Sequence, residues 1–253
     1  MLTSHKLTSC TKQIETAKAL HGGHCLVLVD TPGFDDTHES DVVILKRIAD
    51  WLKNAYNSKA CIGGIIYLHD ISNNRFSGSA RQNLQVFNSM CGEAAFRKVV
   101  FGTTHWDDID KSIAKIHLKG RSMLSSGASV CNLELTPASA FGVIETIIQK
   151  QAAFSAEHGF GQSFTCPDAG MTIQKEMAVQ KKSVQETKAA KSLRTTLKEI
   201  VLLQKQMLAI EEMEALGEVD GYDAKRRHLE RLADQVQALR VSLPKRLRSL
   251  LPF

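Results

Sequence analysis

The clearest chemical signal in the sequence is the tetrapeptide at residues 30–33 (Asp-Thr-Pro-Gly), which follows the apolar run 25–29. At the end of a strand, an aspartate placed like Asp30 can hold a Mg²⁺ ion through water, and a glycine N–H can meet the terminal phosphate of a nucleotide. Glycine suits this place because a Cβ atom would keep the backbone away from the phosphate oxygens. Asp, Pro and Gly also form ordinary turns, so a simple turn is the alternative.

A second polar segment, residues 103–107 (Thr-Thr-His-Trp-Asp), follows the apolar residues 99–101. A carboxylate at Asp107 can accept two N–H hydrogen bonds from the edge of guanine, a pair of donors that adenine does not offer. In the alternative interpretation, Asp107 or Asp108 caps a helix that begins near Ile109. Both can hold, since neighbouring acids can divide the two roles.

Strands, loops and helices alternate along the chain and would position these two segments. The apolar runs at 25–29, 64–68 and 99–101 predict buried parallel strands. Helices are predicted at 39–56, 78–90 and 109–123, the first with Ser40 or Asp41 as its cap. The alternation predicts an α/β fold, a parallel sheet covered by helices, with ligands at the carboxyl ends of the strands.

The sequence changes character after residue 170. Residues 171–216 contain no Pro or Gly and space their apolar residues three or four apart, which predicts one long helix. After an interruption at 217–221, the same spacing resumes over 222–243, so an antiparallel helical hairpin is expected. We therefore expect a domain over 1–155, a linker over 156–170 and a helical or coiled-coil extension over 171–253.

Several segments in the same order resemble a known family. Residues 7–12 (LTSCTK), 26–37 (LVLVDTPGFDDT) and 104–107 (THWD) look like the septin-like and GIMAP (avirulence-induced) branch of P-loop GTPases. Residues 65–78 (IIYLHDISNNRFSG) more closely resemble a large group of fungal G-domain proteins. The match covers roughly residues 5–150, and it implies a G domain that binds GTP or GDP with Mg²⁺.

The resemblance also assigns roles around the phosphates. Thr11 would be the switch threonine whose hydroxyl reaches Mg²⁺, Asp30 the aspartate that binds Mg²⁺ through water, and Gly33 the sensor of the γ-phosphate. Phe34 occupies the position where many GTPases carry a water-orienting Gln, so hydrolysis would be slow and would need another group, a partner or a dimer.

At the base end, the resemblance places Thr104, His105 and Asp107 in the guanine-specificity motif. Thr replaces the commoner Asn, and His replaces the Lys that packs under the base. Ser139 would stand at the loop that approaches the guanine carbonyl, and a plain helix cap is the equal alternative for this residue.

One element of the family is missing from the sequence. The chain contains no Gly-x-x-x-x-Gly-Lys-Ser/Thr segment, whose N–H groups and Lys hold the β- and γ-phosphates. In the family this loop follows a central strand, which lies between the strand that ends at Asp30 and the one that ends near Leu68. We therefore expect an incomplete sheet in a product truncated before Met1, with unpaired strand edges, low stability and poor nucleotide affinity.

Charge and composition bound the remaining functions. Residues 1–170 carry 16 basic and 16 acidic side chains, whereas 171–253 carry 16 and 11. The six cysteines lie far apart without a CxxC pair, so reduced thiols are expected. No apolar run approaches the roughly 20 residues of a membrane span, and a cytoplasmic location is expected.

Partners are predicted mainly for the last third of the chain. The helical region 171–243 would bind a helical partner or a second copy of the chain. The basic, leucine-rich segment 225–253 is either a solvated helix end or a segment that lies on an anionic membrane surface. Nucleic acid is not expected, because aromatic stacking platforms are lacking and the body of the protein is neutral.

Two functions therefore remain in competition. The first is a GTP-binding, Mg²⁺-dependent nucleotide switch with slow hydrolysis. The second is a non-enzymatic interaction or assembly protein with a degenerate G domain and a helical hairpin.

Overall fold

The computed structural model describes residues 11–34, 36, 39–72, 78–106, 121–157, 170–214 and 219–240. The chain forms two compact units, one made of residues 1–50 with 182–253 and the other of residues 51–181. These units are defined by spatial contacts and do not coincide with the domain, linker and extension predicted from the sequence. Those boundaries stay a prediction. Each unit is described by itself.

The first unit begins with an antiparallel hairpin of β1 (Glu15–His21) and β2 (His24–Asp30). The turn residues Gly22 and Gly23 have φ angles of +56° and +79°, a backbone conformation that glycine adopts without a steric cost. The expectation of a buried parallel strand at 25–29 was therefore wrong. This strand is antiparallel and partly exposed, because the glycine pair before it is a hairpin turn that returns the chain from a preceding strand.

Helix α1 (Asp41–Asn57) agrees with its prediction to within two residues. The Val43 amide donates to both the carbonyl oxygen and the hydroxyl of Ser40, at 2.9 and 3.4 Å, so Ser40 rather than Asp41 caps the helix. The apolar positions recur every three or four residues, and the buried ones are Ile44, Leu45, Ile48, Ala49, Leu52 and Ala55.

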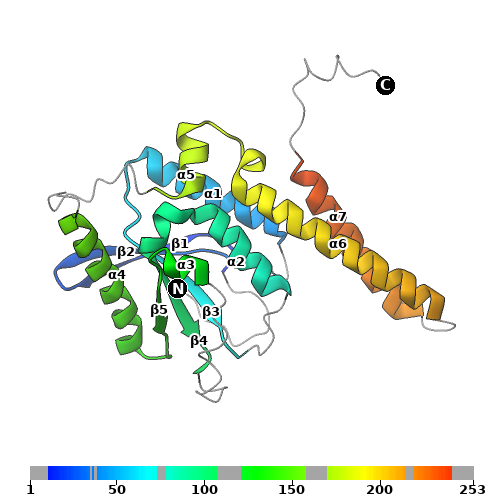
Figure 1. The fold of residues 1–253 in the computed structure, drawn as a ribbon, viewed down its shortest axis with the longest axis horizontal. Helices are drawn as coiled ribbons and strands as arrows, with labels where there is room; N and C mark the ends of the chain where they lie inside the picture. Colours follow the sequence, from blue (N-terminus) through cyan, green and yellow to red (C-terminus); the bar gives the residue numbers. More distant parts are fainter. Residues whose placement is uncertain are drawn as a thin grey trace. The chain divides into compact units, whose positions relative to one another are not determined.

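The second unit contains a parallel three-stranded sheet in the order β3-β4-β5 (Figure 1). The strands are β3 (Ile65–Asp70), β4 (Val99–Thr104) and β5 (Ser129–Asn132). The parallel pairing of β3 with β4 confirms the strands predicted at 64–68 and 99–101. Parallel strands need a crossover connection, and α2 (Gly78–Cys91), predicted at 78–90, lies between these two in the sequence.

Different helices contact the two faces of this sheet. On one face, Phe87 of α2 packs against Tyr67 and Phe101, with ring centroids 4.7 and 6.4 Å away. On the other face, α4 (Pro137–Glu157) donates a hydrogen bond of 2.6 Å from Lys150 Nζ to the hydroxyl of Ser129. The α/β class and a parallel sheet with helices on both faces are thus confirmed, but β3 is less buried than expected, since Ile66 and Leu68 are 40% and 60% exposed.

The smaller elements of this unit connect the sheet and its helices. The 3-10 helix η1 (Glu93–Lys98) precedes β4, and the short helix α3 (Arg121–Ser125) precedes β5. Helix α5 (Thr172–Gln174) continues into the π-helix η4 (Lys175–Val179) and is tied to α1 within this unit, since Gln174 Nε2 donates to the Leu52 carbonyl at 3.2 Å.

The long helix predicted over 171–216 is interrupted. Lys181 has a φ of +56°, and a separate 3-10 turn, η5 (Val184–Glu186), begins after Ser183. The carboxylate of Glu186 accepts hydrogen bonds from the Ser183 amide and hydroxyl, both at 2.8 Å. This capping box ends one helical segment and starts another, because it satisfies the N–H groups that a continuous helix would bond internally.

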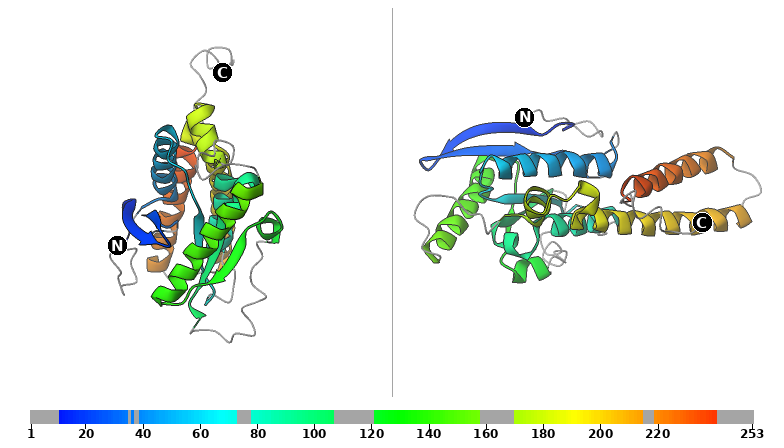
Figure 2. Two further views of the ribbon diagram at one scale, coloured as in Figure 1. Left: turned by 90° about the vertical axis from the view of Figure 1, so that its left-hand side faces the viewer. Right: turned by 90° about the horizontal axis from the view of Figure 1, so that it is seen from above.

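The predicted helical hairpin is present in the first unit, with bounds that differ from the sequence prediction. Helix α6 (Lys188–Glu214) and helix α7 (Val219–Ala238) run side by side in opposite directions (Figure 2). Their buried apolar residues include Leu208 on α6 and Leu232 and Val236 on α7, and Leu239 directly after α7 is buried as well. No helix among the described residues combines the length and apolarity required to span a bilayer.

Candidate functional site

The β1–β2 hairpin brings two predicted Mg²⁺ ligands together. Thr11 Oγ1 donates a hydrogen bond of 3.0 Å to Asp30 Oδ2, although the two residues are 19 positions apart. The pairing register explains this proximity. Glu15 lies opposite Asp30, so the segment that enters β1 runs beside the segment that leaves β2.

The chemistry of this pair suits a hard cation. A hydroxyl and a carboxylate oxygen are ligand types that Mg²⁺ accepts, and Mg²⁺ commonly uses one or two protein oxygens together with water and phosphate oxygens. Thr11 is half-buried, as is Asp30, so the pair remains accessible. The residues present therefore fit the ion that the resemblance implies.

Gly33 follows the pair on an open part of the loop. A Cβ atom added to Gly33 would meet nothing within 4 Å, and the residue is exposed. The space on the side-chain side of Gly33 is therefore open. Pro32 before it is buried and Phe34 after it is half-buried.

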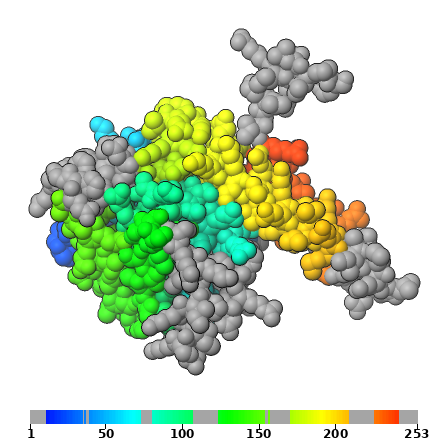
Figure 3. Space-filling model, viewed as in Figure 1, coloured from blue at the N-terminus to red at the C-terminus, as the bar shows by residue number. Residues whose placement is uncertain are grey.

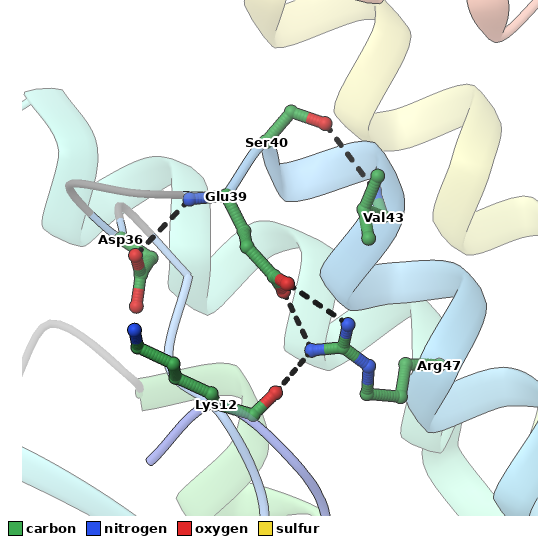
Figure 4. A network of polar contacts seen from close by, with 6 residues as sticks. All are labelled: Lys12, Asp36, Glu39, Ser40, Val43 and Arg47. Atoms are coloured by element: carbon green, nitrogen blue, oxygen red, sulfur yellow. Dashed lines mark hydrogen bonds and ion pairs between the residues drawn. The ribbon is translucent and has the colours of Figure 1, made fainter. Parts of the chain in front are cut away.

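A polar network beside this pair was not anticipated from the sequence (Figure 4). Arg47 on α1 donates from Nη1 to the Lys12 carbonyl, and it holds both carboxylate oxygens of Glu39, at 2.5 and 3.0 Å. The Glu39 amide in turn donates to Asp36 Oδ1 at 3.1 Å. The hydrogen bond from Arg47 lowers the pKa of Glu39 and raises the pKa of Arg47, so both stay charged at neutral pH.

The predicted base-binding residues belong to the second unit, at the carboxyl end of its sheet. Thr104 ends β4, and its hydroxyl donates to the His69 carbonyl of β3 at 3.4 Å. His105 follows with a φ of +62°, a left-handed conformation that turns the chain sharply as it leaves the strand. Trp106 Nε1 then donates to the Thr103 carbonyl at 2.8 Å and braces this turn. Asp107 lies outside the described residues, as do Asp108 and Ile109 of the capping alternative.

Ser139 lies near the end of the neighbouring strand. Its hydroxyl donates to the Asn132 carbonyl at 3.1 Å and accepts from the Glu134 amide at 2.9 Å. The cap of α4 is Thr136, whose Oγ1 accepts from the Ser139 amide at 3.2 Å. The capping alternative for Ser139 was therefore wrong, because the serine sits inside the first turn and braces the loop before it.

Asp70 is a further charged residue at this edge that the sequence interpretation did not select. Partial burial acts to raise the pKa of Asp70, but hydrogen bonds from the Ser72 hydroxyl and amide, together with His105 and His69, lower it overall. The two bonds from Ser72 measure 2.6 and 2.8 Å. An Asp-x-Ser pattern just after a strand is the local turn signal that could have indicated this arrangement.

The structure thus brings Thr11 and Asp30 together in one unit, with Gly33 on the same loop. It places Thr104 and His105 next to each other in the other unit, with Ser139 at the end of the next strand. No group of three or more His, Cys, Asp or Glu residues that could hold a metal ion occurs in the described part of the chain. No protein-family model matches the sequence, and no curated protein matches it significantly.

Proposed function

We propose that this protein binds guanine nucleotides with Mg²⁺ as a switch of the septin-like or GIMAP type, with slow hydrolysis. The observation that carries the proposal is the hydrogen bond of 3.0 Å between Thr11 and Asp30. The resemblance assigns these two residues to one Mg²⁺ ion, and the hairpin register accounts for their meeting without reference to any family.

Each residue would have a limited task in nucleotide binding. Asp30 and Thr11 would hold the Mg²⁺ ion, which neutralises phosphate charge when bound. In the first unit, the Gly33 amide would donate to a phosphate oxygen. In the second unit, the resemblance assigns Thr104, His105, Asp107 and Ser139 to binding of the base. The missing phosphate loop would lower the affinity of the sequence as given, because its N–H groups supply much of the phosphate contact.

The test is a displacement titration with a fluorescent GTP analogue, in Mg²⁺ and in EDTA. We expect weak binding that EDTA abolishes, with GTP displacing the analogue at concentrations about tenfold or more below those of ATP, equivalent to ~1.4 kcal/mol. An Asp30→Asn variant should lose most of the Mg²⁺ dependence. Asp50→Asn is the matched control, because Asp50 makes an exposed ion pair with Lys46. Displacement by ATP as readily as by GTP would contradict the proposal.

The second candidate, an interaction or assembly protein, is favoured by one feature of α6. Leu202, Leu203 and Met207 are 59%, 59% and 60% exposed, and α6 is visible along most of its length in Figure 3. Leu203 and Met207 lie about one turn apart on the same side of α6, and exposed apolar side chains at this spacing are typical of helices that bind another helix. Failure of all nucleotide binding, combined with concentration-dependent self-association measured by sedimentation, would favour this second function.

A further inference from the structure

The strongest unexplained feature of the first unit is the position of Arg47. Its guanidinium group connects two segments that are separated by the whole β1–β2 hairpin. One is the backbone at Lys12, the residue directly after Thr11. The other is Glu39, in the loop that follows Gly33.

The guanidinium group is used as a fork. Nη1 donates to both the Lys12 carbonyl and Glu39 Oε2, while Nη2 donates to Glu39 Oε1 at 3.0 Å. A planar group with several fixed donors can make these three contacts at once, whereas a lysine ammonium is a single point charge on a shorter reach. The geometry therefore depends on arginine itself and not only on a positive charge at this position.

The pair is also better sheltered than an ordinary surface ion pair. The side chains of Arg47 and Glu39 are 22% and 31% exposed, against 67% and 48% for the neighbouring pair of Lys46 and Asp50. Water and salt compete less for a partly sheltered, bidentate pair, so its geometry is held more firmly.

The loop side of the network is tied to the start of α1. The Glu39 amide donates to Asp36 Oδ1, and the next residue, Ser40, caps the helix that carries Arg47 (Figure 4). Movement of Glu39 would thus disturb the first turn of α1. Movement of Lys12 would displace Thr11, its neighbour in the sequence, from Asp30.

We propose that Arg47 is a positioning residue for the Thr11–Asp30 cation site, and that it makes the Thr11 segment and the loop after Gly33 move as one assembly. This inference rests on the proposed function for its ligand, a divalent cation with a guanine nucleotide. The mechanical part, the coupling of two backbone segments through one side chain, holds for the protein without any ligand.

Hydrogen exchange measured on the full chain without ligand tests the coupling. In Arg47→Gln, amides in residues 12–18 and 33–40 should exchange about threefold faster or more. The reason is that the variant loses partly solvated, charge-assisted hydrogen bonds that hold both segments. Arg47→Lys should accelerate both segments as well, because the charge remains but the fork is lost. Lys46→Gln is the matched control, since it removes one positive charge from the adjacent position of α1, and it should leave both segments unchanged.

A fourth variant covers the case in which Arg47→Gln fails to fold. Glu39→Gln keeps the arginine and weakens only the loop contact. Relative to wild type, exchange in residues 33–40 should therefore speed up more than exchange in residues 12–18. Unchanged exchange in folded Arg47→Gln, or full rescue by lysine, would overturn the proposal.

Binding of Mn²⁺, followed by its paramagnetic resonance signal with and without GTP, tests the ligand part. Arg47→Gln and Arg47→Lys should weaken Mn²⁺ binding about threefold or more, and Lys46→Gln should not. If the wild-type chain binds neither Mn²⁺ nor GTP, the proposed function and the assigned cation site fail. The exchange measurements decide the coupling independently.

Discussion

The hydroxyl of Thr11 points to the carboxylate of Asp30, and the hydrogen bond between them, at 3.0 Å, closes the open end of the β1–β2 hairpin. The pair lies where the chain enters and leaves the hairpin, the two points that a change in loop conformation would move first. A ligand that binds both oxygens would therefore fix both loops together, which is the behaviour required of a nucleotide switch.

Thr11→Val removes the hydroxyl while keeping a side chain of nearly the same size. We expect the Mg²⁺-dependent part of GTP-analogue binding to weaken about five- to tenfold, because one ligand oxygen and its hydrogen bond are lost. Thr31→Val is the control, since Thr31 is an exposed residue next to Asp30. The titration described above measures both variants, and equal effects of the two would contradict a specific role for Thr11.

Glu39 should contribute to the acid sensitivity of the protein. Its pKa lies below the usual value of 4.5 because of the hydrogen bond from Arg47. A carboxylate with a lowered folded-state pKa stabilises the fold above the unfolded-state value, and this contribution is lost as the pH falls through the folded-state value. Glu39→Gln should therefore be less stable than wild type at pH 7, and the difference in stability should shrink as the pH falls below 4.5. Urea unfolding at pH 7 and at pH 3 measures this, and a difference that does not shrink at pH 3 would contradict the prediction.

Tyr67 should make the second unit sensitive to alkali. Burial against Phe87 and Phe101 raises the pKa of Tyr67 from 10.0 to about 12. Between these values the unfolded chain loses the phenol proton and the folded chain keeps it, so stability falls as the pH rises through this window. Absorbance titration at the tyrosinate band should show a late-ionising tyrosine in the wild type that is absent from Tyr67→Phe. Burial also raises the pKa of the Cys91 thiol, which is a second late-ionising group in both proteins. The effect of Tyr67 is therefore the difference between wild type and Tyr67→Phe.

Gly64 should tolerate no side chain before β3. A Cβ atom there would lie 2.3 Å from Ile147 Cγ2 of α4, closer than real Cβ atoms come, so the Ile147 side chain or the backbone beside it must shift. Gly64→Ala should lower the free energy of unfolding by about 1–3 kcal/mol. Gly63→Ala is the matched control because its Cβ would meet nothing within 4 Å, and we expect a change of no more than ~1 kcal/mol. Chemical denaturation of both variants provides the comparison, and equal losses would contradict the close packing of α4 on the sheet.

Much of the parallel sheet and several of the helices were accessible from the sequence because their signals are local. The apolar runs that form β3 and β4, and the periodic spacing that forms α1 and α2, reflect which face of each element is buried. Strand β1 was missed, since its segment (ETAKALH) is too polar to indicate a strand by itself. It is a strand because the glycine turn returns the chain against β2.

The capping box at Ser183 and Glu186 was predictable only in part, unlike the helices and strands that were predicted and unlike β1, which was missed. Its Ser-x-x-Glu spacing is visible in the sequence, yet the apolar spacing on either side favoured an unbroken helix. Only the fold shows that the capping signal prevails, with a left-handed residue, Lys181, just before it. Helical periodicity continues across such a break because both sides bury apolar faces.

The sequence by itself determined the α/β class, the strands β3 and β4 and the residue types at the ends of β2 and β4, since these follow from patterns between near neighbours. The meeting of Thr11 with Asp30, and the connection of both flanking segments through Arg47, were decided only by the tertiary structure. Arg47 contacts a residue 35 positions away through a backbone carbonyl, and a carbonyl is the same in every residue and leaves no trace in the sequence.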